Sequence, residues 1–281
     1  MRLPDFLIIG AMKSGTTTLY AQLAAQNGVF MPALKEPNFF SDNAVYSQGL
    51  GWYTGLFQDA PEGACLGEAS THYTKLPTYP ETVARLANVL PSPKLVYVLR
   101  DPVRRAVSQY LHEWSKREVS GDISSAFNEN PRLVEYSCYG KQIAPYVEAF
   151  GASAVHLTSL ERLRASPAEE LAAIGAHIRA PEPLEWQSDI AAQNQSGERW
   201  RRLPFQRTLV DNPVAEFARR KLIPKSIRTR VREARRVEAT PELPEPIRTR
   251  IERVFIEDRA RLAAMFPGHP VLADAYPFAA P

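Results

Sequence analysis

A short segment near the N-terminus, residues 10–18, has the residue types of an anion-binding loop and reads Gly-Ala-Met-Lys-Ser-Gly-Thr-Thr-Thr. Lys13 supplies a positive charge, and Gly15 lets the backbone approach a ligand closely. The segment lies between an apolar run and a helical pattern, so backbone N–H groups at the helix N-terminus would attract a phosphate or sulfate group. The candidate ligands are Lys13, Ser14, Gly15, Thr16, Thr17 and Thr18.

The order of residues in this loop differs from the G-x-x-x-x-G-K-[ST] loop of ATP- and GTP-binding proteins. Lys13 precedes Gly15, and the loop is shorter. The longer loop brings its lysine to a triphosphate and its hydroxyl to Mg²⁺, whereas a shorter loop suits a shorter anionic tail bound without a metal. We therefore expect no metal requirement. For this motif alone, an ordinary glycine-containing turn is the alternative.

A second pair of anion-binding residues follows the clearest apolar run of the chain, residues 94–99. Arg100 comes directly after this run, and Ser108 lies about two turns into a helix predicted to begin at Pro102. Ligands of open α/β sheets bind beyond the carboxyl ends of the strands, which is where Arg100 is expected. A guanidinium fork and a hydroxyl suit a phosphate. Taken alone, Arg100 could instead pair with Asp101 at the surface.

Two residues could accept a proton in a reaction at this site, Glu36 and His72. Glu36 precedes Pro37, which predicts an extended backbone at Glu36 and a carboxylate that projects from a loop into a cleft. A histidine has an ordinary pKa of about 6.5, which suits a base. The alternatives are a surface ion pair of Glu36 with Lys35 and a packed loop position for His72.

The elements that must position these residues alternate between strands and helices. We predict strands at residues 6–10, 64–67, 94–99 and 154–157. We predict helices at residues 16–26, 80–90, 102–116, 131–150 and 167–178, with an interruption near Gly140 as the alternative to one continuous helix at 131–150. The alternation indicates an α/β fold with a central, mostly parallel sheet flanked by helices.

Residues 1–281 are predicted to form a single domain. Its C-terminal part, from about residue 181, is rich in proline and is expected to be mostly helix and loop, with a last helix at residues 247–265. The 281 residues, of which 44% are hydrophobic, suffice for one sizeable core.

Charge and cysteine content exclude several function classes. The 34 basic and 31 acidic residues give a net charge of +3, which argues against nucleic acid as a partner. Cys65 and Cys138 are too few for a disulfide framework or a metal cluster and fit a reducing compartment. No apolar run approaches the roughly 20 residues of a membrane span. Because the run at residues 6–10 leaves no room before it for a signal peptide, we expect a cytoplasmic protein.

Several motifs together resemble sulfotransferases that use 3'-phosphoadenosine-5'-phosphosulfate (PAPS). Residues 6–17, Phe-Leu-Ile-Ile-Gly-Ala-Met-Lys-Ser-Gly-Thr-Thr, resemble the loop that binds the 5'-phosphosulfate. Residues 35–40, Lys-Glu-Pro-Asn-Phe-Phe, and residues 46–53 resemble the branch that contains heparan sulfate sulfotransferases. The resemblance implies transfer of a sulfuryl group from PAPS to a hydroxyl or amine of a carbohydrate-like or small organic acceptor, leaving the nucleotide PAP.

The resemblance also implies roles for the candidate residues. Arg100 and Ser108 would hold the 3'-phosphate, and Lys13 would stabilise charge on the leaving phosphate. The heparan-type enzymes have a Lys-Glu pair at the place that Lys35 and Glu36 occupy in this chain. The resemblance therefore makes Glu36 the favoured base and Lys35 a substrate contact. His72 competes with Glu36, because a histidine is the base in the cytosolic small-molecule branch, but that branch's motif does not surround His72.

Three further positions are implied less directly. Tyr139 belongs to a segment that is usually Gly-x-Tyr near the nucleotide, with Ser137 here in place of the glycine. Gly197 and Arg199 lie where the family has a basic loop that closes over the nucleotide. Trp52 could stack on a sugar ring of the acceptor or belong to the core.

Two rival functions differ from sulfuryl transfer in what they require. A small nucleotide kinase should have the longer phosphate loop and an acidic Mg²⁺ ligand at a strand end, and neither is evident in the sequence. A non-catalytic nucleotide-binding protein would use the same anion sites but would tolerate any change at Glu36 and His72.

Overall fold

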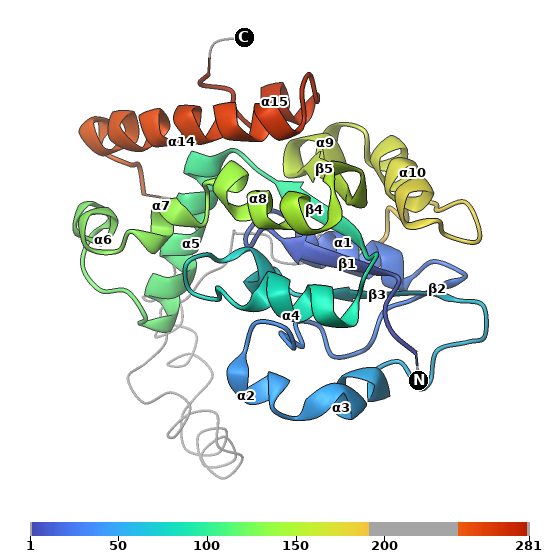
Figure 1. Ribbon diagram of the computed structural model, residues 1–281. Coiled ribbons are helices and arrows are strands. Elements are labelled where there is room, and N and C mark those ends of the chain that lie inside the picture. The colour runs from blue at the N-terminus through green and yellow to red at the C-terminus, as the bar shows by residue number, and fades with distance from the viewer. Residues whose placement is uncertain (1, 191–240, 280–281) are drawn as a thin grey trace, which may run out of the picture.

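The structure is a computed structural model that describes residues 2–190 and 241–279. Its centre is a five-stranded sheet with the order β2-β3-β1-β4-β5, and every neighbouring pair is parallel. Helices lie on both faces of this sheet (Figure 1), so the predicted α/β fold with a central parallel sheet is confirmed. The strands are β1 (Phe6–Gly10), β2 (Val29–Phe30), β3 (Cys65–Ala69), β4 (Lys94–Leu99) and β5 (Val155–Ser159).

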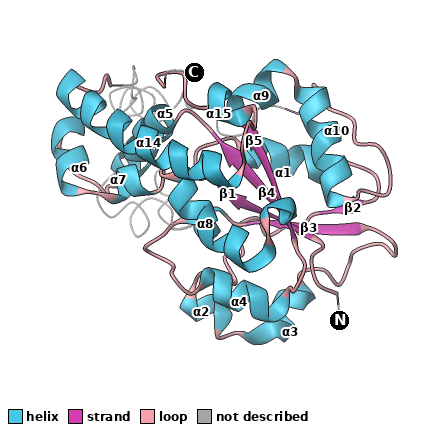
Figure 2. Cartoon of the chain, turned by 45° about the horizontal axis from the view of Figure 1, so that its top comes forward, coloured by secondary structure: helices cyan, strands magenta, loops and turns pink. Residues whose placement is uncertain are grey.

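Two layers of helices enclose the sheet, as Figure 2 shows from a second direction. One layer contains α1 (Thr16–Ala24) and α10 (Pro167–Ile178). The other contains α4 (Thr82–Val89), α5 (Pro102–Lys116), α8 (Tyr139–Phe150) and α14 (Glu245–Met265). Shorter helices complete the described part: α2 (Asn43–Tyr46), α3 (Gly49–Gly55), η1 (Thr71–Thr74), α6 (Ile123–Glu129), α7 (Arg132–Glu135), η2 (Ala152–Ala154), α9 (Leu160–Ala165) and α15 (Val271–Asp274).

Alternate residues of the strands fill the two sides of the core, because successive side chains of a strand point to opposite faces. Phe6 and Ile8 of β1 pack with the layer that contains α1 and α10. Leu7 and Ile9 of the same strand pack with the opposite layer. All four side chains are completely buried, as expected for a parallel sheet that is covered on both faces.

Most predicted elements are confirmed, and one short strand was missed. The helices predicted at residues 102–116 and 167–178 have the predicted bounds, and the last helix begins two residues earlier than predicted. The short strand β2 was not predicted, because two residues carry no measurable period.

The interruption expected near Gly140 in the helix at residues 131–150 is present, since the structure has two helices there, α7 and α8. The start of α8 is fixed from outside the segment. Asp258 of α14 accepts hydrogen bonds from the backbone N–H groups of Gly140, at 2.7 Å, and of Lys141, at 2.8 Å. Gly140 permits this approach, because a Cβ atom there would lie 2.5 Å from the carbonyl oxygen of Asp258.

The fold brings three distant segments to one edge of the sheet. After the central strand β1 the chain enters the candidate anion-binding loop of residues 10–18, called the phosphate loop below. After β3 it enters η1, and β4 is followed directly by Arg100. These strands are neighbours and parallel, so their carboxyl ends meet. A fourth segment joins them, because the backbone N–H of Glu36 donates to the carbonyl of Ala69 at the end of β3, at 3.0 Å.

Candidate active site

A cavity of about 830 Å³ lies at the carboxyl ends of β1, β3 and β4. It is of the size usual for small-molecule sites. Its walls bring together most of the residues that the sequence indicated, although these residues span almost a hundred positions of the chain. The predicted residues in its walls are Lys13, Gly15, Thr16, Thr17, Thr18, Glu36, His72, Arg100 and Ser108.

The phosphate loop turns sharply before α1 begins. Lys13 and Gly15 both have left-handed backbone angles, with φ of 72° and 90°. Gly15 is the N-cap residue of α1 and has no side chain that could occupy the helix N-terminus. A Cβ atom at Gly15 would lie 2.8 Å from Leu160 Cδ1, so glycine is required for packing as well as for conformation. Turns of this kind present backbone N–H groups to anions.

Two arginines donate hydrogen bonds to backbone carbonyls of this loop. Arg100 Nη1 donates to the carbonyl of Lys13 at 2.9 Å, and Arg100 also lines the cavity. Arg105 is completely buried, and its Nη1 lies 3.5 Å from the carbonyl oxygen of Met12. Arg105 was not predicted as a site residue, although its position three residues before Ser108 on a predicted helix is visible in the sequence.

Tyr139 lies beneath Arg100 rather than in the cavity wall. Its side chain is completely buried, and its hydroxyl donates to the carbonyl of Arg100 at 2.8 Å. Ser137, which stands in place of the family's glycine, donates to the carbonyl of Pro102 at 3.0 Å and accepts a bond from Arg105 Nε. These contacts position the strand-end arginine for a ligand.

One face of α5 borders the cavity along two turns. Ser108, His112 and Lys116 all line it, as expected for residues four positions apart on a helix. Only Ser108 was identified from the sequence. The same spacing from Ser108 on a predicted helix would have indicated the other two residues.

Glu36 lies in the cavity wall with its carboxylate held by two residues. Thr71 Oγ1 donates to Glu36 Oε2 at 2.9 Å, the Thr71 backbone N–H donates to the same oxygen at 3.2 Å, and Lys35 Nζ lies 2.8 Å from Oε1. Burial raises the pKa of Glu36, but Lys35 and Thr71 outweigh it and bring the pKa below its ordinary value. The carboxylate is therefore ionised at neutral pH.

The predicted extended backbone at Glu36 is wrong, because φ is 60° at Glu36 and 55° at Asn38. Left-handed geometry at a residue other than glycine is unfavourable by on the order of 1–3 kcal/mol and persists where surrounding contacts fix it. Those contacts come from the end of β3 and beyond, at Ala69, Ser70 and Thr71.

His72 lines the same cavity from η1. Its ring stacks on Tyr79, with ring centroids 4.7 Å apart and an interplanar angle of 16°. Burial, together with the nearby Lys75, lowers the pKa of His72 to about 4. The imidazole is therefore neutral at neutral pH and a weaker base than an ordinary histidine.

Three other predicted residues lie beside the cavity or behind it. Lys35 contacts Glu36 but is not part of the cavity wall. Trp52 stacks on Phe39, with ring centroids 6.1 Å apart, and packs against the core. Ser14 is completely buried within the phosphate loop. Gly197 and Arg199 lie outside the described residues.

Within residues 2–190 and 241–279, no group of three or more His, Cys, Asp or Glu side chains is arranged to hold a metal ion. In the same ranges, no helix has the length and apolar composition of a membrane span.

Comparison with protein families gives one match that covers most of the chain. The family model described as "Sulfotransferase domain" matches residues 3–223. Among solved structures, a sulfotransferase from Alicyclobacillus acidocaldarius has a similar fold, with a TM-score of 0.67, 21% identity, and coverage of 94% of this chain and 96% of that one.

Curated relatives match part of the chain at higher identity. The membrane-associated sulfotransferase kil1 of Dictyostelium discoideum is 34% identical over 157 residues, which are 53% of this chain and 32% of that protein. Heparan sulfate glucosamine 3-O-sulfotransferase 3A1 of Mus musculus is 34% identical over 182 residues, which are 60% of this chain and 44% of that protein. The chain thus spans less than half the length of these relatives.

Proposed function

The chain belongs to the sulfotransferase domain family, and from this premise we propose that it transfers a sulfuryl group from PAPS to a hydroxyl or amine of an acceptor. One observation carries the proposal. A single cavity joins the anion-binding loop, the Arg100–Ser108 pair and the ionised carboxylate of Glu36. A donor with two phosphate-bearing ends and an acceptor that must lose a proton need these three features in one place.

The residues fit the two charged ends of PAPS. The loop before α1 offers backbone N–H groups, the Lys13 side chain and the threonine hydroxyls to the phosphosulfate end. Arg100 is tied to the loop through Lys13, and Ser108 faces the cavity from α5. A guanidinium and a hydroxyl suit the 3'-phosphate, which distinguishes PAPS from ATP.

In the proposed reaction, Glu36 removes the proton of the acceptor hydroxyl or amine as that oxygen or nitrogen bonds to sulfur. The bond between sulfur and the bridging oxygen of the phosphate breaks, and Lys13 with the N-terminus of α1 stabilises the negative charge that the phosphate gains. The proton ends on Glu36, and the products are PAP and the sulfated acceptor. Positioning and electrostatic stabilisation supply the catalysis, by analogy with phosphoryl transfer.

The acceptor class, location and domain organisation belong to the same proposal. One relative is named as a heparan sulfate glucosamine 3-O-sulfotransferase, which supports a carbohydrate-like acceptor, while a small organic hydroxyl fits the same chemistry. The free, buried thiols of Cys65 and Cys138 support a reducing compartment such as the cytoplasm. We further propose that residues 1–281 act as one domain.

The test is calorimetry of the purified chain with PAP, with PAPS, and with ATP and Mg²⁺. We expect PAP and PAPS to bind more tightly than ATP, with no added metal, and PAPS to yield PAP when an acceptor library is present. Mass spectrometry should then show acceptors heavier by one sulfuryl group. Tighter binding of ATP with Mg²⁺ would contradict the proposal and favour a kinase.

A further inference from the structure

Lys75 is a buried cation in the wall of the cavity. The residue is 9% exposed, lies one residue after η1, and lines the cavity together with Glu36 and His72. Taking an ammonium group out of water is unfavourable unless an anion or several hydrogen-bond acceptors replace the water. The buried ammonium group of Lys75 therefore needs an anion or hydrogen-bond acceptors to offset the free energy lost with its water.

Within the described residues, no carboxylate lies within ion-pair distance of Lys75 Nζ and no acceptor hydrogen bonds to it. Its contact is with the ring of Tyr136, 5.9 Å from the ring centroid. The two carboxylates whose fields act on it, Glu36 and Glu113, are already engaged. Glu36 is bound by Lys35 and Thr71, and Glu113 accepts a hydrogen bond from Gln109 Nε2 at 2.7 Å.

A second polar atom in the same wall also lacks a partner. His72 Nδ1 is buried and has no hydrogen-bond partner among the described residues. Because the ring of His72 is stacked on Tyr79, its orientation is fixed. Lys75 and His72 are three residues apart in sequence and both line the cavity, so one oxyanion bound between them could satisfy the ammonium and the imidazole nitrogen.

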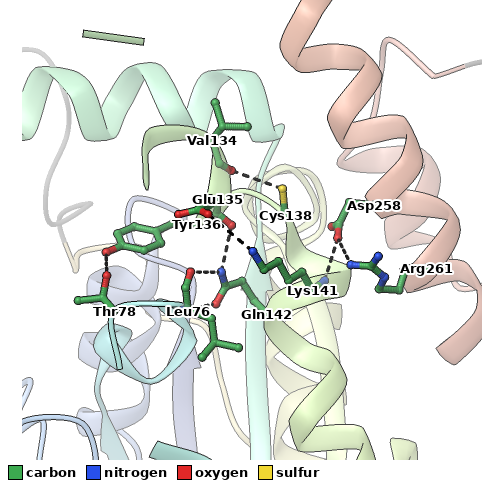
Figure 3. Close-up of polar contacts among 10 residues, drawn as sticks. All are labelled: Leu76, Thr78, Val134, Glu135, Tyr136, Cys138, Lys141, Gln142, Asp258 and Arg261. Atoms are coloured by element: carbon green, nitrogen blue, oxygen red, sulfur yellow. Dashed lines mark hydrogen bonds and ion pairs between the residues drawn. The ribbon is translucent and has the colours of Figure 1, made fainter. Parts of the chain in front are cut away.

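The segment that carries Lys75 is held rigidly, as Figure 3 shows for its neighbours. Gln142 of α8 accepts from the Leu76 backbone N–H at 2.7 Å and donates to the Leu76 carbonyl at 2.9 Å. Thr78 and Tyr136 are joined through their hydroxyls, which fixes the ring under Lys75. These contacts fix the backbone that follows Lys75 and the aromatic ring that its ammonium group contacts.

We propose that Lys75 and His72 form an oxyanion subsite in the acceptor half of the cavity, which binds a sulfate-like or carboxylate group beside Glu36. Lys116 of α5 also lines the cavity, and its positive charge adds to the attraction. The oxyanion has two sources under the proposed function, on which this inference rests. It is either the sulfuryl group of the donor or an acid group of the acceptor.

The test follows Lys75 directly by NMR, with lysine labelled at Cε with ¹³C and the Lys75 signal assigned by its absence from Lys75→Met. Sodium sulfate is titrated at constant ionic strength, with and without saturating PAP. We expect the Lys75 signal to shift saturably, and Lys75→Met to weaken sulfate binding about 10- to 100-fold, as for a lost charge-assisted hydrogen bond. His72→Phe should weaken it less.

Two controls guard against a fold defect. Lys75→Arg keeps a cation and should retain sulfate binding, and Lys141→Met removes a half-exposed lysine that is ion paired with Glu135 and should change nothing. If the chemical shift of the Lys75 signal does not change with sulfate, either with or without PAP, the proposed subsite is wrong. Failure to bind PAP would instead contradict the proposed function, so the two failures are distinguishable.

The source of the oxyanion is decided by two further measurements on Lys75→Met. If the subsite holds the sulfuryl group, PAPS should bind more weakly while PAP binds as before. If it holds an acid group of the acceptor, both nucleotides should bind as before, and 4-nitrophenyl β-glucuronide should lose its advantage over the neutral 4-nitrophenyl β-glucoside in competing for the cavity. If neither measurement responds, the subsite is contradicted.

Discussion

Lys75→Met should make the folded protein more stable at neutral pH, although it removes a residue of the site. Burial of the ammonium lowers the pKa of Lys75 from 10.5 to about 8. A tenfold change in an equilibrium constant is about 1.4 kcal/mol, so a fall of this size corresponds to about 3 kcal/mol of unfavourable free energy for the charged, folded form. Methionine has a similar shape and no charge to bury.

The pH dependence of this effect has a definite sign. The unfolded chain holds the Lys75 proton up to about pH 10.5, whereas the folded chain releases it above about pH 8. Between these values the unfolded state binds more protons, so the stability contributed by this group rises with pH. Below about pH 8 both states are protonated, and the full cost is present. The advantage of Lys75→Met should therefore be largest below pH 8 and should shrink towards pH 10.5.

Urea unfolding of the wild type and of Lys75→Met at pH 7, 8, 9 and 10, in chloride buffer, measures this difference, because the titration of groups that do not interact with Lys75 cancels between the two proteins. Added sulfate should stabilise the wild type more than the variant, since a ligand that binds the folded state stabilises it by mass action. A variant that is less stable than the wild type at pH 7, with a difference that does not change with pH, would refute the reasoning.

Four other predictions test the rest of the site. Glu36→Gln keeps the shape of the side chain but not its basicity, so turnover should fall by about 10²–10⁴-fold with PAP affinity unchanged; near-normal turnover together with an inactive His72→Asn would make His72 the base. Arg100→Ala should weaken PAP by on the order of 1.5–3 kcal/mol and its analogue without the 3'-phosphate by much less, as measured by calorimetry. EDTA should leave PAP binding and turnover unchanged, and a loss restored by Mg²⁺ would contradict a metal-free site. Gly140→Ala would place a Cβ atom 2.5 Å from the Asp258 carbonyl oxygen, so it should lower stability by about 1–3 kcal/mol in thermal unfolding without changing PAP affinity in the folded protein.

The sequence predicted those parts of the site that follow directly from local patterns. The apolar runs that become β1 and β4 end at Gly10 and Leu99, as the alternation of hydrophobic and turn residues indicated. The start of α5 could be predicted because Pro102 stands at the first helical position. Asp101 caps the helix, since its side chain accepts from the N–H groups of Val103 and Arg104. A strand end followed by a capped helix therefore located Arg100 and Ser108.

The parts that were missed depend on contacts between distant segments. Lys75 follows a 3-10 helix of four residues, which has no hydrophobic period to reveal it. The rule for residues before proline failed at Glu36, because hydrogen bonds with Ala69 and Thr71, more than thirty residues away, fix its backbone and carboxylate. The exact start of α8, which the sequence placed only as near Gly140, likewise depends on Asp258 of α14.

The helix α5 shows how one element serves the phosphate loop and the cavity together. Its positions Ser108, His112 and Lys116 line the cavity. Arg105 Nη2 donates to Gln109 Oε1 at 2.7 Å, and Gln109 Nε2 donates in turn to Glu113 Oε1 at 2.7 Å. Through Gln109, the buried positive charge of Arg105 is linked to the carboxylate of Glu113, which lies two helical turns further along α5. The guanidinium can therefore remain beside the Met12 carbonyl without a carboxylate at the loop itself, where a negative charge would repel a phosphate.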